Sequence, residues 1–227
     1  MMPALPLRAN FSPRLQAELI RLYADMLRTD PEARQKAAQS GLVDETDPGF
    51  YVAMSNAYLP VTPDLGVLLH MLAKLAKAQF MIEFGTSFGL STLFLAAALQ
   101  AQGRGKLIST ELIASKAAQA RLNLLAAGLE EWVEIREGDA LLTLQAGLQE
   151  PLDLVFLDGP KQLYMAVYEL LTPYLVSGSL IISDNSEMIG AADFLAHMRD
   201  PANGFISCSL QTSALGHQLG HELFMKK

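Results

Sequence analysis

Residues 81–101 constrain the fold of this chain more than any other segment. An apolar strand runs into a loop that contains Gly85 and Gly89, and an apolar helix follows over residues 90–101. Glycine lets the backbone approach a ligand closely, and Ser91 stands where a helix N-terminus offers free N–H groups. The loop reads E-x-G-x-x-x-G-x-S, whereas a dinucleotide-binding loop reads G-x-G-x-x-G. The segment favours a nucleotide-binding turn, with a plain strand-to-helix connection as the alternative.

Four later segments have the composition of strands, and each ends in polar residues. They are predicted at residues 106–111, 132–137, 152–157 and 179–183. Glu111 ends the first, 26 positions after Gly85, close to where doubly wound folds place a ribose-binding carboxylate. The other three are followed by Asp139 and Ala140, by Asp158, and by Asp184 and Asn185. Because open α/β sheets bind ligands at the carboxyl edge, we expect these residues to meet at one edge.

The alternation of strands with helical segments predicts an α/β fold, a Rossmann-like doubly wound sheet that is mostly parallel. Two final strands, residues 205–211 and 220–225, are expected to form a C-terminal antiparallel hairpin joined by residues 212–218. Thr62 and Pro63 provide an N-cap and first position for a helix through residue 78. Its leucines fall at helical spacing and predict core packing: Leu65, Leu68, Leu69, Leu72 and Leu75.

The N-terminal quarter is predicted to be a helical segment of the same domain. Residues 1–60 contain helices near 13–28 and 31–39, followed by an irregular stretch over 41–60. Residues 61–227 then form the ligand-binding part of the domain.

Taken together, these residues resemble the class I S-adenosylmethionine-dependent methyltransferases. Within that class the chain is similar to the cation-dependent O-methyltransferases related to catechol and caffeoyl-CoA O-methyltransferases. The resemblance spans residue 61 to the C-terminus and rests on the loop from Glu83 to Ser91 together with Glu111. It implies S-adenosylmethionine (SAM) as cofactor. The predicted cofactor contacts are Val61, Glu83, Gly85, Thr86, Ser87, Ser91, Glu111, Asp139, Ala140 and Asp158.

The resemblance also implies a divalent cation held by Asp158, Asp184 and Asn185, with Lys161 and Asp158 as the catalytic residues. Carboxylate and amide oxygens are ligands that Mg²⁺, Mn²⁺ or Ca²⁺ prefers. Beside the metal in a partly dry site, Lys161 is expected to have a lowered pKa. The alternatives are helix capping for the two acids and an ordinary solvated lysine.

The chain departs from the family between Asp158 and Lys161. Gly159 and Pro160 stand where the catechol enzymes carry His-Trp, so no aromatic ring is available there to stack on adenine. The acceptor-side loops match no acceptor-recognition pattern.

Composition limits the partners. The net charge of −7 without a basic run argues against nucleic acid. The single cysteine, Cys208, suits a reducing cytoplasm and is expected to be buried. No export or membrane segment is visible. None of the histidines, His217 and His221 included, has a spacing that indicates a metal ligand. The apolar N-terminal helices predict a homodimer.

Three functions follow from the sequence. The first is a cation-dependent O-methyltransferase acting on a small hydroxylated, aromatic, catechol-like acceptor. The second is a SAM-dependent methyltransferase without metal chemistry, in which Asp158 only positions the acceptor. The third is a non-catalytic cofactor-binding protein or a nucleotide-dependent oxidoreductase. Chelator sensitivity separates the first two, and binding of SAM against NAD separates both from the third.

Overall fold

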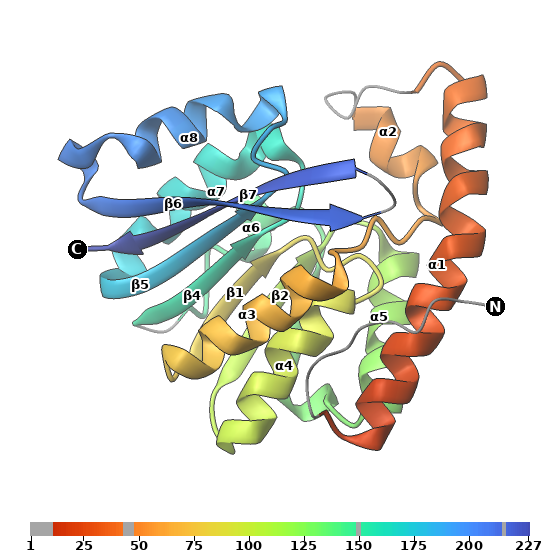
Figure 1. Cartoon of the computed structure of the whole chain (residues 1–227), viewed down its shortest axis with the longest axis horizontal. Coiled ribbons are helices and arrows are strands. Elements are labelled where there is room, and N and C mark those ends of the chain that lie inside the picture. The colour runs from red at the N-terminus through yellow and green to blue at the C-terminus, as the bar shows by residue number, and fades with distance from the viewer. Residues whose placement is uncertain (1–10, 43–47, 149–150, 215–216) are drawn as a thin grey trace.

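The fold is built on one mixed β-sheet, seen here in a computed structural model that describes residues 11–42, 48–148, 151–214 and 217–227. Seven strands of these residues pair in the order β3-β2-β1-β4-β5-β7-β6 (Figure 1). The first five are parallel, and β7 pairs antiparallel with both β5 and β6. The predicted mostly parallel, doubly wound sheet with a C-terminal antiparallel hairpin is therefore confirmed. The strands are β1 Phe80–Phe84, β2 Lys106–Glu111, β3 Val133–Glu137, β4 Leu152–Leu157, β5 Leu175–Asp184, β6 Phe205–Ala214 and β7 His217–Lys226.

Helices cover both faces of the sheet. They are α1 Pro13–Gln39, α2 Pro48–Ala53, α3 Pro63–Leu75, α4 Leu90–Gln102, α5 Ala114–Ala127, α6 Ala140–Thr143, α7 Tyr164–Leu171 and α8 Ala192–Arg199. Successive strand residues point to opposite faces. Met81 accordingly packs in the hydrophobic cluster of α1, α3, α4 and α5, whereas Ile82 packs in the cluster of α6, α7 and α8. Burial on both faces explains why β1 and β4 are almost entirely apolar.

The N-terminal region differs from the prediction in two ways. Instead of two helices, α1 is continuous and includes Pro31. Proline removes one helical hydrogen bond, but tertiary contacts hold the helix on both sides of it. The carboxylate of Asp30 accepts the backbone N–H groups of Tyr58 and Leu59, at 2.7 and 2.9 Å. Ala33 and Ala37 pack in a third cluster with Phe50, Met54 and Ala57. The stretch expected to be irregular contains α2.

Several smaller expectations are settled by burial and pairing. Thr62 caps α3 as predicted, since its hydroxyl accepts the Leu65 N–H at 3.1 Å. Leu65 and Leu69 are buried as predicted, but Leu75, the last residue of α3, is 76% exposed. The prediction of a buried Cys208 is wrong: β6 is an edge strand, and the side chain is exposed.

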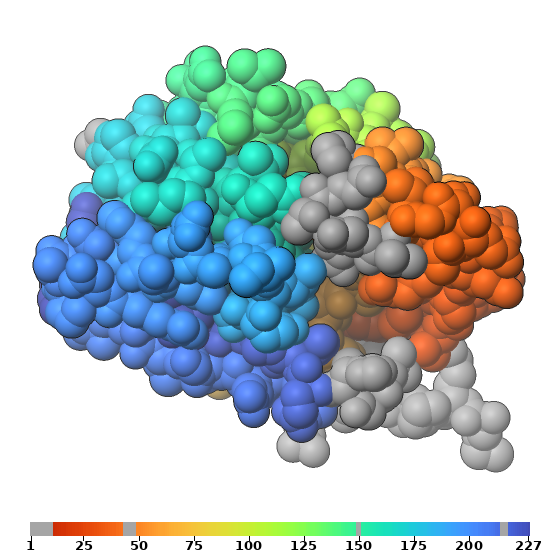
Figure 2. All heavy atoms as spheres, turned by 90° about the horizontal axis from the view of Figure 1, so that it is seen from above, coloured from red at the N-terminus to blue at the C-terminus, as the bar shows by residue number. Residues whose placement is uncertain are grey.

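The final hairpin is longer than predicted. Residues expected in its loop pair across the hairpin, as Thr212 does with Leu219 and Ser213 with Gln218. β5 is also longer than expected and begins at Leu175. Seen from above, the N-terminal helices lie at one end of the molecule, and the last part of the chain lies at the other (Figure 2). No helix among the described residues has the length and apolar character needed to cross a membrane.

Candidate active site

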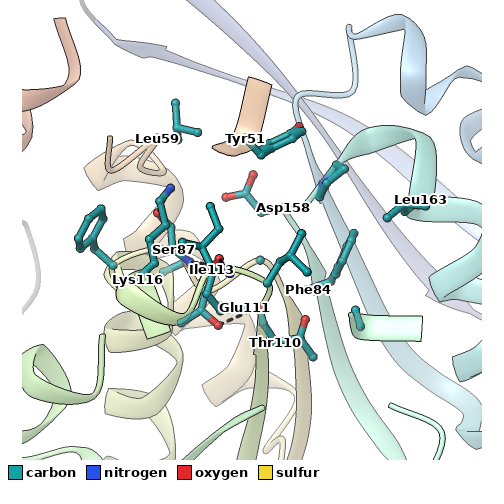
Figure 3. Close-up of a pocket in the computed structure, with 18 of the residues that line it drawn as sticks. Tyr51, Leu59, Phe84, Ser87, Thr110, Glu111, Ile113, Lys116, Asp158 and Leu163 are labelled. Carbon is teal, nitrogen blue, oxygen red and sulfur yellow. Dashed lines mark hydrogen bonds between the residues drawn. The ribbon is translucent and has the colours of Figure 1, made fainter. Parts of the chain in front are cut away.

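A cavity of about 530 Å³ opens at the carboxyl ends of β1, β2, β3 and β4. This volume lies in the range of small-molecule sites. Figure 3 shows Glu111 and Thr110 on one wall, Lys116 and Ser87 on a second, and Asp158 below Tyr51 on a third. Nine of the ten predicted cofactor contacts line it: Val61, Gly85, Thr86, Ser87, Ser91, Glu111, Asp139, Ala140 and Asp158. The structure thus brings together residues that are up to 97 positions apart, from 61 to 158.

The Gly85 turn brings the ends of three strands together. Gly85 has φ +102°, and a Cβ built there would lie 2.8 Å from the carbonyl carbon and oxygen of Asp158. The N–H groups of Gly85 and Thr86 both donate to the carbonyl of Thr110, at 3.2 and 3.0 Å. The N–H of Asp158 donates to the carbonyl of Phe84 at 2.8 Å. Only glycine permits this approach, because any side chain would collide with the backbone of the neighbouring strand end.

Glu111 is fixed at the end of β2 by backbone donors. Its Oε2 accepts the N–H of Ser87 at 2.7 Å, and its Oε1 accepts the N–H of Ile113 at 2.9 Å. The side chain lines the cavity although the residue is 8% exposed. A carboxylate has about four lone-pair positions, so each oxygen retains capacity to accept a ligand hydroxyl.

Glu83 is the predicted cofactor contact that does not line the cavity. It is fully buried, and its Oε2 accepts the hydroxyls of Thr92 and Ser109, both at 2.6 Å. Its Oε1 is a buried atom with no hydrogen-bond partner among the described residues. Burial raises the pKa of this carboxyl to about 7, although the hydroxyl donors act in the opposite direction. A protonated Glu83 is uncharged, so the free-energy cost of burying its side chain in the core is much smaller than that of burying a carboxylate.

The partly buried Asp158 and the buried Asp184 form an acid pair where β4 and β5 end. Burial raises the pKa of Asp158 well above its usual range, and the negative charge of Asp184 raises it further. Burial also acts to raise the pKa of Asp184, but His221, Lys161 and the Asn185 N–H outweigh burial, and the pKa is lowered. Two adjacent carboxylates in a poorly solvated site cannot both ionise freely without a nearby positive charge, and Lys161 provides one here.

Lys161 lies beside this pair and outside the cavity lining. Its Nζ is 3.1 Å from Oδ1 of Asp158 and 5.3 Å from the ring centre of Tyr164. The side chain is 5% exposed, so the solvated alternative does not hold. The expected lowering of its pKa is wrong: burial acts in that direction, but Tyr164, Asp158 and Asp184 outweigh it and raise the pKa.

Of the predicted cation ligands, only Asp158 lines the cavity. Asp184 is buried, and Asn185 follows it directly, with φ +50° and a partly exposed side chain. The N–H of Asn185 donates to Oδ1 of Asp184 at 2.8 Å. Within the described ranges, no three His, Cys, Asp or Glu side chains are grouped as a metal site. The predicted set of two carboxylates and one amide would therefore need further ligands from the acceptor or from water.

Sequence reasoning missed one wall of the cavity. It includes Lys116, which is 4% exposed and whose Nζ lies 3.3 Å from the Ser87 hydroxyl oxygen. Burial lowers the pKa of this lysine although Glu111 acts against that. The Ser87 hydroxyl donates to the carbonyl of Tyr58 at 2.7 Å, and the Tyr58 ring stacks on Phe88 at 4.4 Å. A lone lysine on a helix and an irregular, tyrosine-containing stretch gave no local signal of this role.

Comparison with known proteins places this site in a family. Residues 41–197, well over half of the chain, match the family described as O-methyltransferase. The chain belongs to this O-methyltransferase family. It is 36% identical over 130 residues to a catechol O-methyltransferase of Niastella koreensis, a match that covers 56% of this chain and 58% of that enzyme. The match thus spans less than two thirds of that relative.

Solved structures of O-methyltransferases have the same fold. An O-methyltransferase from Bacillus cereus in complex with SAH superimposes with a TM-score of 0.68 at 28% identity, covering 85% of this chain and 96% of that one. TomG of Streptomyces achromogenes, an O-methyltransferase involved in tomaymycin synthesis and solved in complex with SAM, gives a TM-score of 0.67 at 26% identity. That match covers 86% of this chain and 88% of TomG.

Glu83 is expected to make the free energy of unfolding depend on pH. Because its folded-state pKa is raised to about 7 from 4.5, the folded protein keeps a proton that the unfolded chain releases between these values. Its stabilising contribution is complete below the unfolded pKa and is lost as the pH rises through the folded pKa. Relative to Glu83→Gln, the wild type should lose up to about 1.4 kcal/mol of unfolding free energy per pH unit in this window.

Urea titrations of both proteins at about pH 5, 6 and 7 measure this difference. A difference that stays constant with pH would contradict a protonated, buried Glu83.

Proposed function

We propose that the protein transfers a methyl group from SAM to a hydroxyl of a small, aromatic, catechol-like acceptor. The observation on which this depends is the cavity that a backbone-fixed Glu111 and Asp158 both line, with Asp184 next to Asp158 but outside the lining. A site that aligns a cationic donor with an acceptor oxygen needs both elements: an anchor for the donor and negative charge near the reacting centre. The catechol O-methyltransferase relative and the SAM-containing structure support the same activity.

The residues of the cavity suit SAM. Glu111 would accept the ribose hydroxyls, because its two oxygens are held in place by Ser87 and Ile113 and still have free lone pairs. The Gly85 turn leaves space that a Cβ would fill. Ala140 and Pro160 line the cavity and offer small apolar surfaces for the adenine in place of an aromatic ring. Asp158 would lie near the sulfonium and hold its positive charge.

The acid pair also suits a hard divalent cation. Each carboxylate has its Oδ1 bound by the protein, to Lys161 in Asp158 and to the Asn185 N–H in Asp184. In Asp158, burial and the neighbouring charge of Asp184 outweigh the Lys161 ammonium and raise the pKa of the carboxyl, so further positive charge would stabilise the ionised pair. When bound, a cation such as Mg²⁺, Mn²⁺ or Ca²⁺ would lower the pKa of the acceptor hydroxyl and offset the charge of the two carboxylates.

Lys161 would accept the proton of the acceptor hydroxyl. In the structure the carboxylates hold this lysine in its charged form, since they raise its pKa. A base must be uncharged, so the proposed role requires that their negative charge be compensated during the reaction. Tyr51 lies above Asp158 in Figure 3 and lines the cavity, where its ring would contact an aromatic acceptor.

A metal-free methyltransferase remains the second candidate. The observation that favours it is that Lys161 and His221 each already lie beside one of the two carboxylates, at 3.1 and 2.6 Å. In that case Asp158 would position the acceptor, and no cation would be needed. A cytoplasmic location and a homodimer stay predictions. Among the described residues of α1 and α2, Ile20, Leu27 and Val52 are large apolar side chains that are exposed and that a second copy would cover.

Glu111→Ala should weaken SAM binding by about 1–3 kcal/mol, because ribose hydroxyls would lose a charged acceptor. Glu137→Ala is the matched control, since Glu137 lies opposite Glu111 at the end of β3 with an exposed side chain. Calorimetric titration of the folded variants with SAH and SAM gives the affinities. Unchanged affinity in Glu111→Ala would remove Glu111 from the donor site.

Asp184→Ala should abolish metal-stimulated turnover and leave donor binding nearly intact, because the Gly85 loop and Glu111 lie on other strands. The measurement is methyl transfer from labelled SAM to a panel of catechols and hydroxycinnamoyl esters, with and without chelator. Asp193→Ala, at an exposed position of α8, serves as control. If Asp184→Ala works at the wild-type rate in chelator, the metal-free candidate replaces the cation-dependent one.

Lys161→Ala should retain donor and metal binding but lower the turnover rate by about 10²–10⁴-fold, the usual contribution of a positioned base. Partial recovery at high pH is expected, because the acceptor then ionises without help. Lys74→Ala, on the exposed side of α3, is the control. The turnover rate of Lys161→Ala is measured from about pH 7 to 10. If it stays low across this range, Lys161 holds Asp158 in place and is not the base.

A further inference from the structure

The C-terminal hairpin packs against Asp184, the last residue of β5, and against the loop that follows it. In the antiparallel register, His221 of β7 lies opposite Asp184 of β5. Next to it, the carbonyl of Gly220 accepts the Ser186 N–H at 2.9 Å, and the Gly220 N–H donates to Oε2 of Glu187 at 2.9 Å. A Cβ at Gly220 would lie 2.7 Å from that same Oε2. The strand therefore packs directly on the residues that follow Asp184.

His221 is the buried polar group of this hairpin that faces the acid pair. The residue is 1% exposed, and its Nδ1 lies 2.6 Å from Oδ1 of Asp184. This short contact joins the ring on β7 to the carboxylate at the end of β5. Its other nitrogen, Nε2, lies 2.7 Å from the hydroxyl oxygen of Thr212 on β6.

The partners on the two sides of the ring select its tautomer. Carboxylate oxygens only accept hydrogen bonds, so the nitrogen beside Asp184 is the one that should bear the hydrogen. Nε2 is then the acceptor, and the Thr212 hydroxyl donates to it. Thr212 thereby fixes both the ring plane and the position of the hydrogen, as second partners of histidines commonly do.

We propose that His221, held by Thr212, is a positioning residue for the cation site. It fixes Oδ1 of Asp184, together with the Asn185 N–H, so that Oδ2 is left in a constant orientation for a hard divalent cation. The inference rests on the cation-dependent form of the proposed function. The inference gives His221 a role although the spacing of the histidines in the sequence does not indicate a metal ligand.

A role in packing alone predicts a different effect of substitutions at His221 on cation affinity. If His221 only filled space between β5 and β6, then any side chain of similar size that keeps the fold would leave cation affinity unchanged. If it positions Asp184, the requirement is for an N–H at the place of Nδ1. Asparagine can place its amide nitrogen there, whereas glutamine places its amide nearer to the position of Nε2.

The test is Mn²⁺ binding by the full chain saturated with SAH, followed by the electron paramagnetic resonance signal of free Mn²⁺. His221→Gln should weaken Mn²⁺ binding by about 10–100-fold, the usual effect of losing a hydrogen-bond partner of a metal ligand. His221→Asn should keep most of the wild-type affinity for Mn²⁺. Thr212→Val, which removes the hydroxyl and keeps the shape, should give a smaller loss, and Thr212→Ser should bind as the wild type does. Gln218→Ala, an exposed change on the same hairpin, is the control.

SAH affinity and the unfolding midpoint, measured for every variant, separate positioning from damage to the fold. The proposal is supported if Mn²⁺ affinity falls in His221→Gln and Thr212→Val while SAH affinity stays constant. It is overturned if His221→Gln binds Mn²⁺ as tightly as the wild type, or if His221→Asn binds Mn²⁺ as weakly as His221→Gln. Neither result contradicts the cation site itself. A wild type that binds no Mn²⁺ overturns the cation-dependent function and this inference together. If His221→Gln does not fold, Thr212→Val and His221→Asn still decide the outcome.

Discussion

The close approach of Gly85 to the backbone of Asp158 is the constraint on which the site depends. It sets the end of β1 against the end of β4, while Thr110 accepts two N–H groups of the same turn from the other side. The turn then presents Ser87 to Glu111, so Glu111 and Asp158 are held at fixed positions in the lining of one cavity. A side chain at Gly85 would push these strand ends apart, because backbone atoms cannot yield as the tip of a flexible side chain can.

A series of polar contacts connects the charged residues at the cavity with the edge strand of the sheet. Asp158 contacts Lys161, Asp184 lies beside His221, and His221 contacts Thr212 on the edge strand. The hydroxyl of Tyr164 donates to the carbonyls of Leu157 and Asp184, at 2.7 and 3.2 Å, and so joins the ends of β4 and β5. Hydrogen bonds in a network of this kind reinforce one another, so we expect a change at the edge strand to alter the position of Asp184.

The N-terminal helix contributes to the site from outside the sheet. Asp30 holds two backbone N–H groups of the segment before α3, and Ser87 holds the carbonyl of Tyr58 in the same segment. That segment includes residues that line the cavity, among them Leu59, which adopts φ +46°. Non-glycine residues reach this conformation at a free-energy cost, which the hydrogen bonds that Asp30 accepts and the one that Ser87 donates offset.

The sequence by itself determined the order of the seven strands along the chain, the Gly85 turn and the polar residues at the strand ends, because these depend on local periodicity, glycine and short-range spacing. It also predicted nine of the residues that line the cavity. Tertiary structure alone decided that Pro31 lies inside a continuous helix, that Lys116 enters the cavity, and that the pKa of Lys161 is raised. It also placed His221 against Asp184. Each of these outcomes depends on groups distant in sequence or on the sum of burial and charge around one atom, and neither quantity is written in a local pattern.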